Sequence, residues 1–179
     1  MGTAQRGFNL VETMTAMAVV AIAATLALPS FEGTLRRTRT ATALHRITSS
    51  LALARNTALM RRGPVSVCPS QDGRHCRKDG MWEEGWIVFP DPDKTGEPAS
   101  DADVIRIEDP ISHNLILRAT PGRHRARFQA NGQAVGSTLT LSLCLRDDLR
   151  PLGRVILNNW GRVRVVRDPG QTQPCLASP

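Results

Sequence analysis

The hydrophobic and polar positions divide the chain into a long apolar run, a helical stretch and a series of short apolar runs. Residues 8–28, FNLVETMTAMAVVAIAATLAL, carry one charged side chain, Glu12. At about 1.5 Å per helical residue the run spans roughly 31 Å, which matches the hydrocarbon core of a bilayer. A cleaved secretory signal fits less well, because only Arg6 precedes the run and a carboxylate lies inside it. We therefore predict a membrane-spanning helix over residues 8–28.

Hydrophobic residues continue at helical spacing after Pro29. They are Leu35, Leu44, Ile47, Leu51, Leu53, Ala54, Ala58 and Leu59. Gly63 and Pro64 then form a strong stop signal, because glycine commonly ends a helix and proline cannot continue one. We expect one long helix over residues 8–62 and a globular domain over residues 63–179.

Short runs rich in β-branched and aliphatic residues follow, with turn-forming residues between them. They cover residues 65–68, 85–89, 103–107, 114–119, 125–130, 139–145, 154–157 and 162–166. No second helical pattern occurs among them. The predicted fold is therefore α+β, with a long helix packed on an antiparallel sheet or sandwich.

The formal net charge of +7 is distributed unevenly. Residues 1–109 are balanced, whereas residues 110–179 contain ten Arg and three Asp and no Lys. Arginine binds phosphate bidentately, and a surface of this kind favours polyanions such as nucleic acid. The alternative is a solvated face of a basic protein that has no ligand.

Two arginine stripes alternate with apolar residues. Residues 154–157 and the strand that begins at Arg162 read as a hairpin around the turn 158–161. Alternation places Arg162 and Arg164 on one face and directs Val163 and Val165 to the core. The strand is expected to end or bulge at residues 166–167.

The second stripe is Arg123, Arg125 and Arg127, opposite Ala126 and Phe128. The two stripes would form one groove if the fold made them adjacent. Trp160 in the hairpin turn can stack on a base, but we expect it to pack against the domain.

Four cysteines allow three disulfide pairings. Their even number after an apolar segment favours disulfides in an oxidising compartment over free buried thiols. The favoured pairing is Cys68–Cys76 around a small polar loop and Cys144–Cys175, which would tie the tail to the domain.

Catalytic and metal-binding patterns find little support. The four His residues lack metal-ligand spacing, and no nucleophile motif surrounds any Ser. Residues 91–103 suggest a calcium loop, but Thr95 and Ala102 occupy two of its ligand positions, so a solvated turn is expected. Trp82 and Trp86 are expected to pack rather than form a ligand platform. We predict no enzyme activity, no cofactor and no metal.

The stretch RGFNLVETM resembles the class III leader of type IV pilins and type II secretion pseudopilins. The resemblance implies that residues 1–7 are a leader, that a prepilin peptidase cuts after Gly7, and that Phe8 is then N-methylated. It implies that Glu12 neutralises the terminal amine of a neighbouring subunit during assembly, and that Pro29 kinks the helix. The residues after Phe8 depart from the usual Thr-Leu-Ile-Glu-Leu.

Further motifs resemble the FimT/GspH branch of minor pilins. They are SLALARNTALMRRG at the end of the helix and CPS…C…W.EGWIVFPD…G…VIRI in the domain. The stretch GRVR, Gly161 to Arg164, also fits the Gly-Arg-x-Arg motif of FimT-type minor pilins, which bind DNA in natural transformation. The resemblance makes Arg162 and Arg164 the phosphate contacts, supported by Arg154 and Arg167 and extended by the stripe from Arg123 to Arg127.

The function implied is a minor type IV pilin that binds DNA and contributes to pilus assembly. Its partners would be DNA, other major and minor pilins, the prepilin peptidase and the inner membrane. It would be a single-pass inner-membrane protein with a periplasmic domain that later enters a surface pilus. The alternatives are a structural minor pseudopilin of a type II secretion system, for which GRVR is only part of the fold, and an adhesion module for anionic surfaces.

Overall fold

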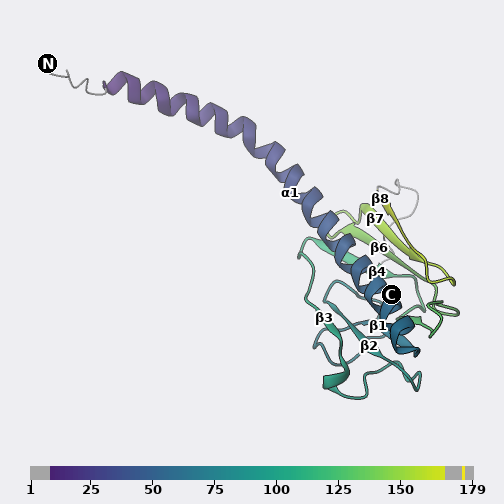
Figure 1. Cartoon of the computed structure of the whole chain (residues 1–179). Coiled ribbons are helices and arrows are strands. Elements are labelled where there is room, and N and C mark those ends of the chain that lie inside the picture. Colours follow the sequence, from purple (N-terminus) through teal and green to yellow (C-terminus); the bar gives the residue numbers. More distant parts are fainter. Residues whose placement is uncertain (1–8, 168–174, 176–179) are drawn as a thin grey trace. The chain divides into compact units, whose positions relative to one another are not determined.

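A computed structural model describes residues 9–167 and Cys175, apart from the side chains of residues 24–32 (Figure 1). The chain divides into two compact units, residues 1–38 and residues 39–179. The expected leader and its processing residues, Gly7 and Phe8, lie outside the described residues.

The long helix, α1, extends from Leu10 to Arg61. It is continuous in backbone through Pro29, and the kink expected there remains a prediction. The helix ends at Arg61, one residue before the predicted end, because Arg62 has a φ of 52° and the N–H of Gly63 donates to the carbonyl oxygen of Ala58 at 3.2 Å. Glu12 is exposed in its first turn.

Within the described residues, no helix combines the length and the apolar character that crossing a membrane requires. The span predicted from the sequence, residues 8–28, extends into residues whose side chains are not described.

In the described part of the chain, eight strands form two four-stranded antiparallel sheets, and each strand overlaps a run predicted from the sequence. The first sheet has the order β3-β2-β1-β5, with β3 (Arg106–Glu108), β2 (Trp86–Pro90), β1 (Val65–Pro69) and β5 (Ala126–Phe128). The second has the order β4-β6-β7-β8, with β4 (Leu115–Ala119), β6 (Leu139–Leu145), β7 (Pro151–Leu157) and β8 (Val163–Arg167). A short 3-10 helix, η1, covers Asp101–Asp103. The α+β fold expected from the sequence is confirmed.

One hydrophobic core joins α1 to both sheets. The helix contributes side chains spaced three or four residues apart, which place them on one face: Ala43, Leu44, Ile47, Leu51, Ala54 and Ala58. Trp82 and Trp86 are fully buried in this core, as expected, and the guanidinium of Arg46 lies 5.3 Å from the centre of the Trp86 ring. Leu35 and Leu59, which fit the helical pattern, are exposed instead.

Both favoured disulfides are present, with Cα–Cα distances of 5.5 Å for Cys68–Cys76 and 6.2 Å for Cys144–Cys175. Cys144 pairs across the sheet with Ile116, and these two residues form a small buried cluster with Cys175. The second disulfide therefore covers the face of the β4–β8 sheet that points away from the main core.

The segment 91–103 begins differently from the expected solvated turn. Asp91 is buried. Its carboxylate accepts a hydrogen bond from Ser66 Oγ at 2.7 Å and forms an ion pair with Arg127 at 2.7 Å. The pairing explains the burial, because a carboxylate removed from water must be compensated by donors and an opposite charge. Most of the later residues of the segment are exposed.

Candidate nucleic-acid interface

The hairpin of β7 and β8 ends in a tight turn over residues 158–162. The N–H of Asn158 donates to the carbonyl oxygen of Arg162 at 3.1 Å, and the N–H of Arg162 donates to Oδ1 of Asn158 at 2.9 Å. The N–H of Gly161 donates to the carbonyl oxygen of Asn158 at 2.9 Å, which closes the turn. These bonds fix the backbone from which Trp160 and Arg162 project.

Gly161 docks the tip of this hairpin on a second turn. Its φ is 73°, a conformation that favours glycine, and a Cβ there would collide with the carbonyl oxygen of Gly132. The N–H of Ala134 also donates to the carbonyl oxygen of Asn159 at 2.8 Å. Gly132 in turn leaves space for a side chain of α1, because a Cβ on it would lie 3.2 Å from Nε of Arg55. The glycine of GRVR thus has a packing role of its own.

The register of β8 determines which face each arginine occupies. Arg164 pairs with Ile156, and Arg154 pairs with Val166, so Arg154 and Arg164 share the face that points away from the core. Arg167 pairs with Gly153, over which Leu44 of α1 packs, and it therefore lies on the other face. Arg162 and Arg164 are exposed, whereas Arg154 is half-buried.

Two expectations about this strand need correction. Val163 packs against the core, but Val165 is 37% exposed although it lies on the same face. The cause is its position, because β8 is the last strand of the sheet and the core does not extend beneath it. The strand also has no bulge at residues 166–167, since its register with β7 is regular through Arg167, which is its last described residue.

Trp160 does not pack against the domain as expected, since 67% of it is exposed. It lines a cavity of about 420 Å³ whose walls are Arg55, Asn131, Gln133, Trp160 and Arg162. Nε of Arg55 is buried and has no hydrogen-bond partner among the residues that the structure describes. Sequence reasoning missed Arg55, because its neighbours come from turns more than 70 residues further along the chain.

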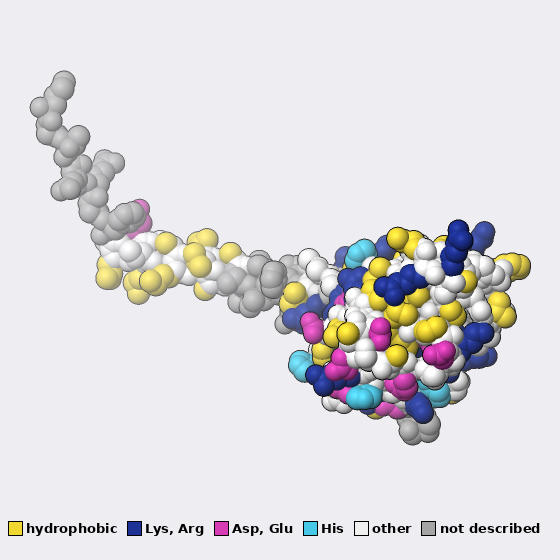
Figure 2. All heavy atoms as spheres, turned by 60° about the horizontal axis from the view of Figure 1, so that its bottom comes forward, with side chains coloured by type: hydrophobic (Ala, Val, Ile, Leu, Met, Phe, Trp, Pro, Cys, Tyr) yellow, Lys and Arg dark blue, Asp and Glu magenta, His cyan; other side chains and the backbone are white. Residues whose placement is uncertain are grey.

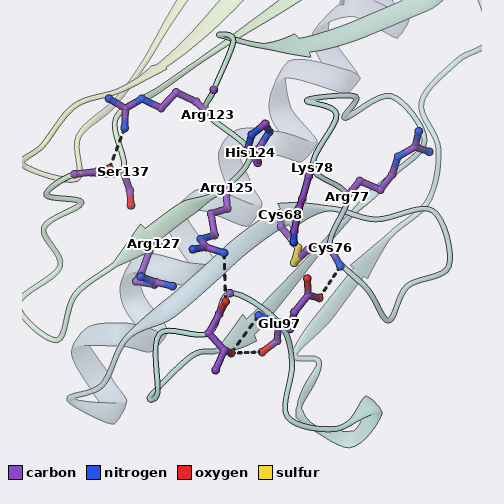
Figure 3. A pocket seen from close by; sticks show the side chains of 14 residues that line it. Cys68, Cys76, Arg77, Lys78, Glu97, Arg123, His124, Arg125, Arg127 and Ser137 are labelled. Atoms are coloured by element: carbon purple, nitrogen blue, oxygen red, sulfur yellow. Dashed lines mark hydrogen bonds between the residues drawn. A yellow bond between two sulfur atoms is a disulfide. The ribbon is translucent and has the colours of Figure 1, made fainter.

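The second arginine stripe lines a different cavity, of about 500 Å³, around β5 (Figure 3). Arg125, Arg127 and Lys78 line it together with Arg123, whose side chain reaches toward the segment at Ser137, and Arg77 lies at its edge. The lining of this cavity shares no residue with that of the Trp160 cavity. Arg127 lies in β5 of the first sheet and Arg164 lies in β8 of the second. The cavity lined by Arg123, Arg125 and Arg127 is not the one lined by Arg162, so these arginines lie at two separate cavities rather than in one shared groove.

The arginines of this second cavity are largely engaged by the protein itself. Nη1 of Arg123 donates to the carbonyl oxygen of Gly136 at 3.1 Å, and Nη1 of Arg125 donates to that of Thr95 at 3.5 Å. Arg127 forms the buried ion pair with Asp91 described above. This stripe therefore has a structural role in addition to its charge.

The loop closed by Cys68–Cys76 contains a linked acid and base. Oδ1 of Asp72 accepts the N–H groups of His75 and Arg74, each at 2.9 Å, and Oδ2 lies 2.7 Å from Nδ1 of His75. These hydrogen bonds hold the pKa of the Asp72 carboxyl well below its usual range, and the bond from the His75 N–H makes the largest contribution. The hydrogen bond with Asp72 raises the pKa of His75.

Charge is mixed on the face drawn in Figure 2, where Lys and Arg side chains lie both among acidic ones and in an area that shows only basic ones. Within the described residues, no three His, Cys, Asp or Glu side chains are grouped so that they could hold a metal ion.

A family model described as type II transport protein GspH matches residues 43–161. A search of curated proteins finds no match. Among solved structures, the chain is similar to the type IV minor pilin FimU of Pseudomonas aeruginosa, with 19% identity, a TM-score of 0.62, and coverage of 79% of this chain and 98% of FimU. It is also similar to the minor pseudopilin EpsH from the type 2 secretion system of Vibrio cholerae, with 14% identity, a TM-score of 0.52, and coverage of 74% and 99%.

Proposed function

The chain belongs to the GspH family of type II transport proteins, and from this membership we propose that it is a minor type IV pilin whose β7–β8 hairpin binds extracellular DNA for uptake in natural transformation. The family and the fold support the coarser role, a minor pilin or pseudopilin of a type IV pilus or a type II secretion system. The finer role depends on the arginines of the hairpin.

The observation that carries the proposal is the contrast between two groups of arginines. Within the described part of the chain, the guanidinium groups of Arg162 and Arg164 are exposed and have no ion-pair partner. Arg118 and Arg127 instead pair with the buried carboxylates of Glu83 and Asp91. Exposed, unpaired arginines on a rigid hairpin are suited to bidentate contacts with phosphates, which carry affinity without sequence preference.

Arg154 and Arg164 share a face and would extend the phosphate track across the sheet. Arg167 lies on the opposite face of β8, and the stripe from Arg123 to Arg127 lines a separate cavity. In the proposal Arg162 and Arg164 make the principal contacts with phosphates. The arginines at the other positions, which are Arg123, Arg125, Arg127 and Arg167, contribute through the local electrostatic potential. Gly161 contributes by holding the turn against Gly132.

The location of the protein follows from its N-terminal sequence. We expect a prepilin peptidase to cut between Gly7 and Phe8 and to methylate Phe8, and we expect residues 8–28 to hold the protein in the inner membrane with its domain in the periplasm. Glu12, a single carboxylate in an apolar run, would pair with the terminal amine of a neighbouring pilin. Mass spectrometry of the mature N-terminus measures this directly, and an intact leader would contradict it.

The DNA proposal is tested by fluorescence anisotropy with full-length protein in nonionic detergent and unrelated DNA duplexes at several salt concentrations. The double substitution Arg162→Gln and Arg164→Gln should weaken binding to every sequence. It should also flatten the slope of log K against log salt by about two, because two phosphate contacts are lost.

The matched control is the double substitution Arg36→Gln and Arg37→Gln, which removes the same charge from exposed positions of the other unit. It should leave the slope unchanged. If the hairpin variant binds like the wild type with the same slope, DNA binding through the hairpin is wrong. A transformation assay in the parent organism should follow the same order of variants.

The second candidate function is that of a structural minor pseudopilin without a ligand. The packing of Gly161 against Gly132 favours it, because that contact explains the glycine of GRVR by the needs of the fold alone. The neighbouring genes distinguish the two, since pilus and competence genes would accompany the first and secretion genes the second.

A further inference from the structure

We propose that the cavity beside Trp160 holds an unpaired nucleobase, so that the protein prefers single-stranded DNA to closed duplex. The inference rests on the proposed function, because it assumes that the neighbouring Arg162 contacts phosphate. It adds a base contact that phosphate binding alone does not require.

Trp160 is presented as an open aromatic surface on a fixed backbone. Its indole is exposed, while the residues on both sides of it are anchored, Asn159 through the Ala134 N–H and Gly161 against Gly132. An aromatic ring held in this way can stack on a base without losing much conformational freedom on binding. Stacking of this kind is tolerant of sequence, because every base has a π-face.

The walls of the cavity complement a nucleotide. Asn131 and Gln133 offer amide groups that can meet the polar edge of a base, and Arg55 and Arg162 supply two cations for the adjoining phosphates. Oδ1 of Asn131 already accepts the N–H of Gln133 at 3.0 Å, which leaves its amide nitrogen as the donor. The volume of about 420 Å³ lies in the range usual for small-ligand sites, roughly 300–1,000 Å³.

Arg55 is the cation on the α1 side of the cavity. Its Nε is buried and has no hydrogen-bond partner within the described residues. The residue as a whole is only half-buried, so a phosphate would approach its guanidinium from the cavity rather than through Nε. Arg55 comes from α1 and Trp160 from the last hairpin, so the packing of Gly132 and Gly161 brings the two together.

The preference for single strands follows from access. In a closed duplex the bases are paired and stacked on each other, so their faces are not available to a side chain. An unpaired strand can place a base on the indole while its phosphates meet the arginines. Strand ends and single-stranded segments should therefore bind more tightly than the interior of a duplex.

The experiment compares three probes of equal phosphate number: single-stranded oligothymidylate, a closed duplex, and an abasic oligonucleotide that keeps the backbone and lacks the bases. Full-length protein in detergent is titrated with each, and both anisotropy and intrinsic tryptophan fluorescence are recorded. Oligothymidylate should bind about ten-fold more tightly than the abasic strand, the effect of stacking one base. It alone should quench the fluorescence strongly, because Trp82 and Trp86 are buried and only Trp160 is open to the solvent.

The substitution Trp160→Ala should remove this ten-fold preference and Trp160→Phe should retain part of it. Met60→Ala removes another exposed apolar side chain, one outside the cavity, and serves as the control. Equal affinities for oligothymidylate and the abasic strand, with no effect of Trp160→Ala, would overturn the base site. That result would leave the proposed phosphate contacts intact. If the double substitution Arg162→Gln and Arg164→Gln instead left the affinity for all three probes unchanged, the proposed function itself would be wrong.

Discussion

Replacing Gly161 with alanine tests whether the glycine of GRVR is needed for packing. The added methyl group meets two obstacles. The first is the φ of 73°, a left-handed conformation that costs an ordinary residue about 1–2 kcal/mol. The second is the collision with the carbonyl oxygen of Gly132, a backbone atom that cannot move away by changing a rotamer.

The magnitude of the second term follows from what overpacking costs in well-packed sites, about 1–3 kcal/mol. The two terms together predict a loss of about 2–5 kcal/mol in the free energy of unfolding. With a urea m-value of about 2 kcal/mol per M, the unfolding midpoint should fall by about 1–2.5 M.

Gly136→Ala is the matched control, because its φ is 75° and a Cβ there would meet nothing within 4 Å. It carries the conformational cost without the collision and should lose about 1–2 kcal/mol. Both variants are unfolded in urea with their disulfides intact and followed by circular dichroism. If Gly161→Ala is no less stable than Gly136→Ala, the tip of the hairpin is not docked on Gly132 and our account of the motif is wrong.

Three further predictions concern the rest of the domain. Replacing Cys144 and Cys175 with serine should lower the free energy of unfolding by up to about 3–4 kcal/mol, since their disulfide links residues 31 positions apart. Non-reducing peptide mapping of the native protein checks the linkage, and an unchanged unfolding midpoint in the variant would contradict the expected loss. His75 should titrate above 6.5 by NMR, and Asp72→Asn should return it toward that value. Because the pKa of His75 is raised in the folded state, the bond stabilises the protein fully below pH 6.5, and the stabilisation is lost as the pH rises through the raised value; a titration unaffected by the substitution would contradict this. Asp91→Ala should destabilise the domain by about 3–5 kcal/mol in urea, because it leaves the charge of its arginine partner without compensation, and a loss under 1 kcal/mol would mean that water reaches this arginine.

The sequence predicted those parts of the fold that local signals determine. Gly63 and Pro64 ended the helix, and turn residues bounded the eight strands, because glycine and proline act through the backbone of their own segment. The disulfide pairing was also predicted. Cys68–Cys76 closes the shortest loop that the four cysteines allow, and Cys144–Cys175 ties the tail to the domain. The order of the strands in each sheet had no such local signal.

What depends on that order was predicted less well. Alternation gave the correct face of Val165 but not its exposure, because only the position of β8 at the edge of its sheet decides whether the core extends to it. The burial of Asp91 depends on Arg127, a residue 36 positions away, and on the pairing of β1 with β5. The cavity at Trp160 likewise needs Arg55 from α1. Long-range neighbours of this kind leave no periodic pattern in one sequence.

The edge position of β8 has one more consequence. Among the described strands it pairs only with β7, so one side of its backbone presents N–H and C=O groups that another strand can bind. Charged side chains on such an edge oppose self-association between copies of a protein, and Arg164 and Arg167 lie on it. Substitution of Arg164 with glutamine would therefore weaken this protection. A variant that self-associates through this edge would bind DNA less well because its hairpin is covered, in addition to having lost the phosphate contacts. Lysine at Arg162 and Arg164 keeps the charge and the protected edge but loses the planar fork of arginine, so it isolates the bidentate phosphate contact from the protection of the strand.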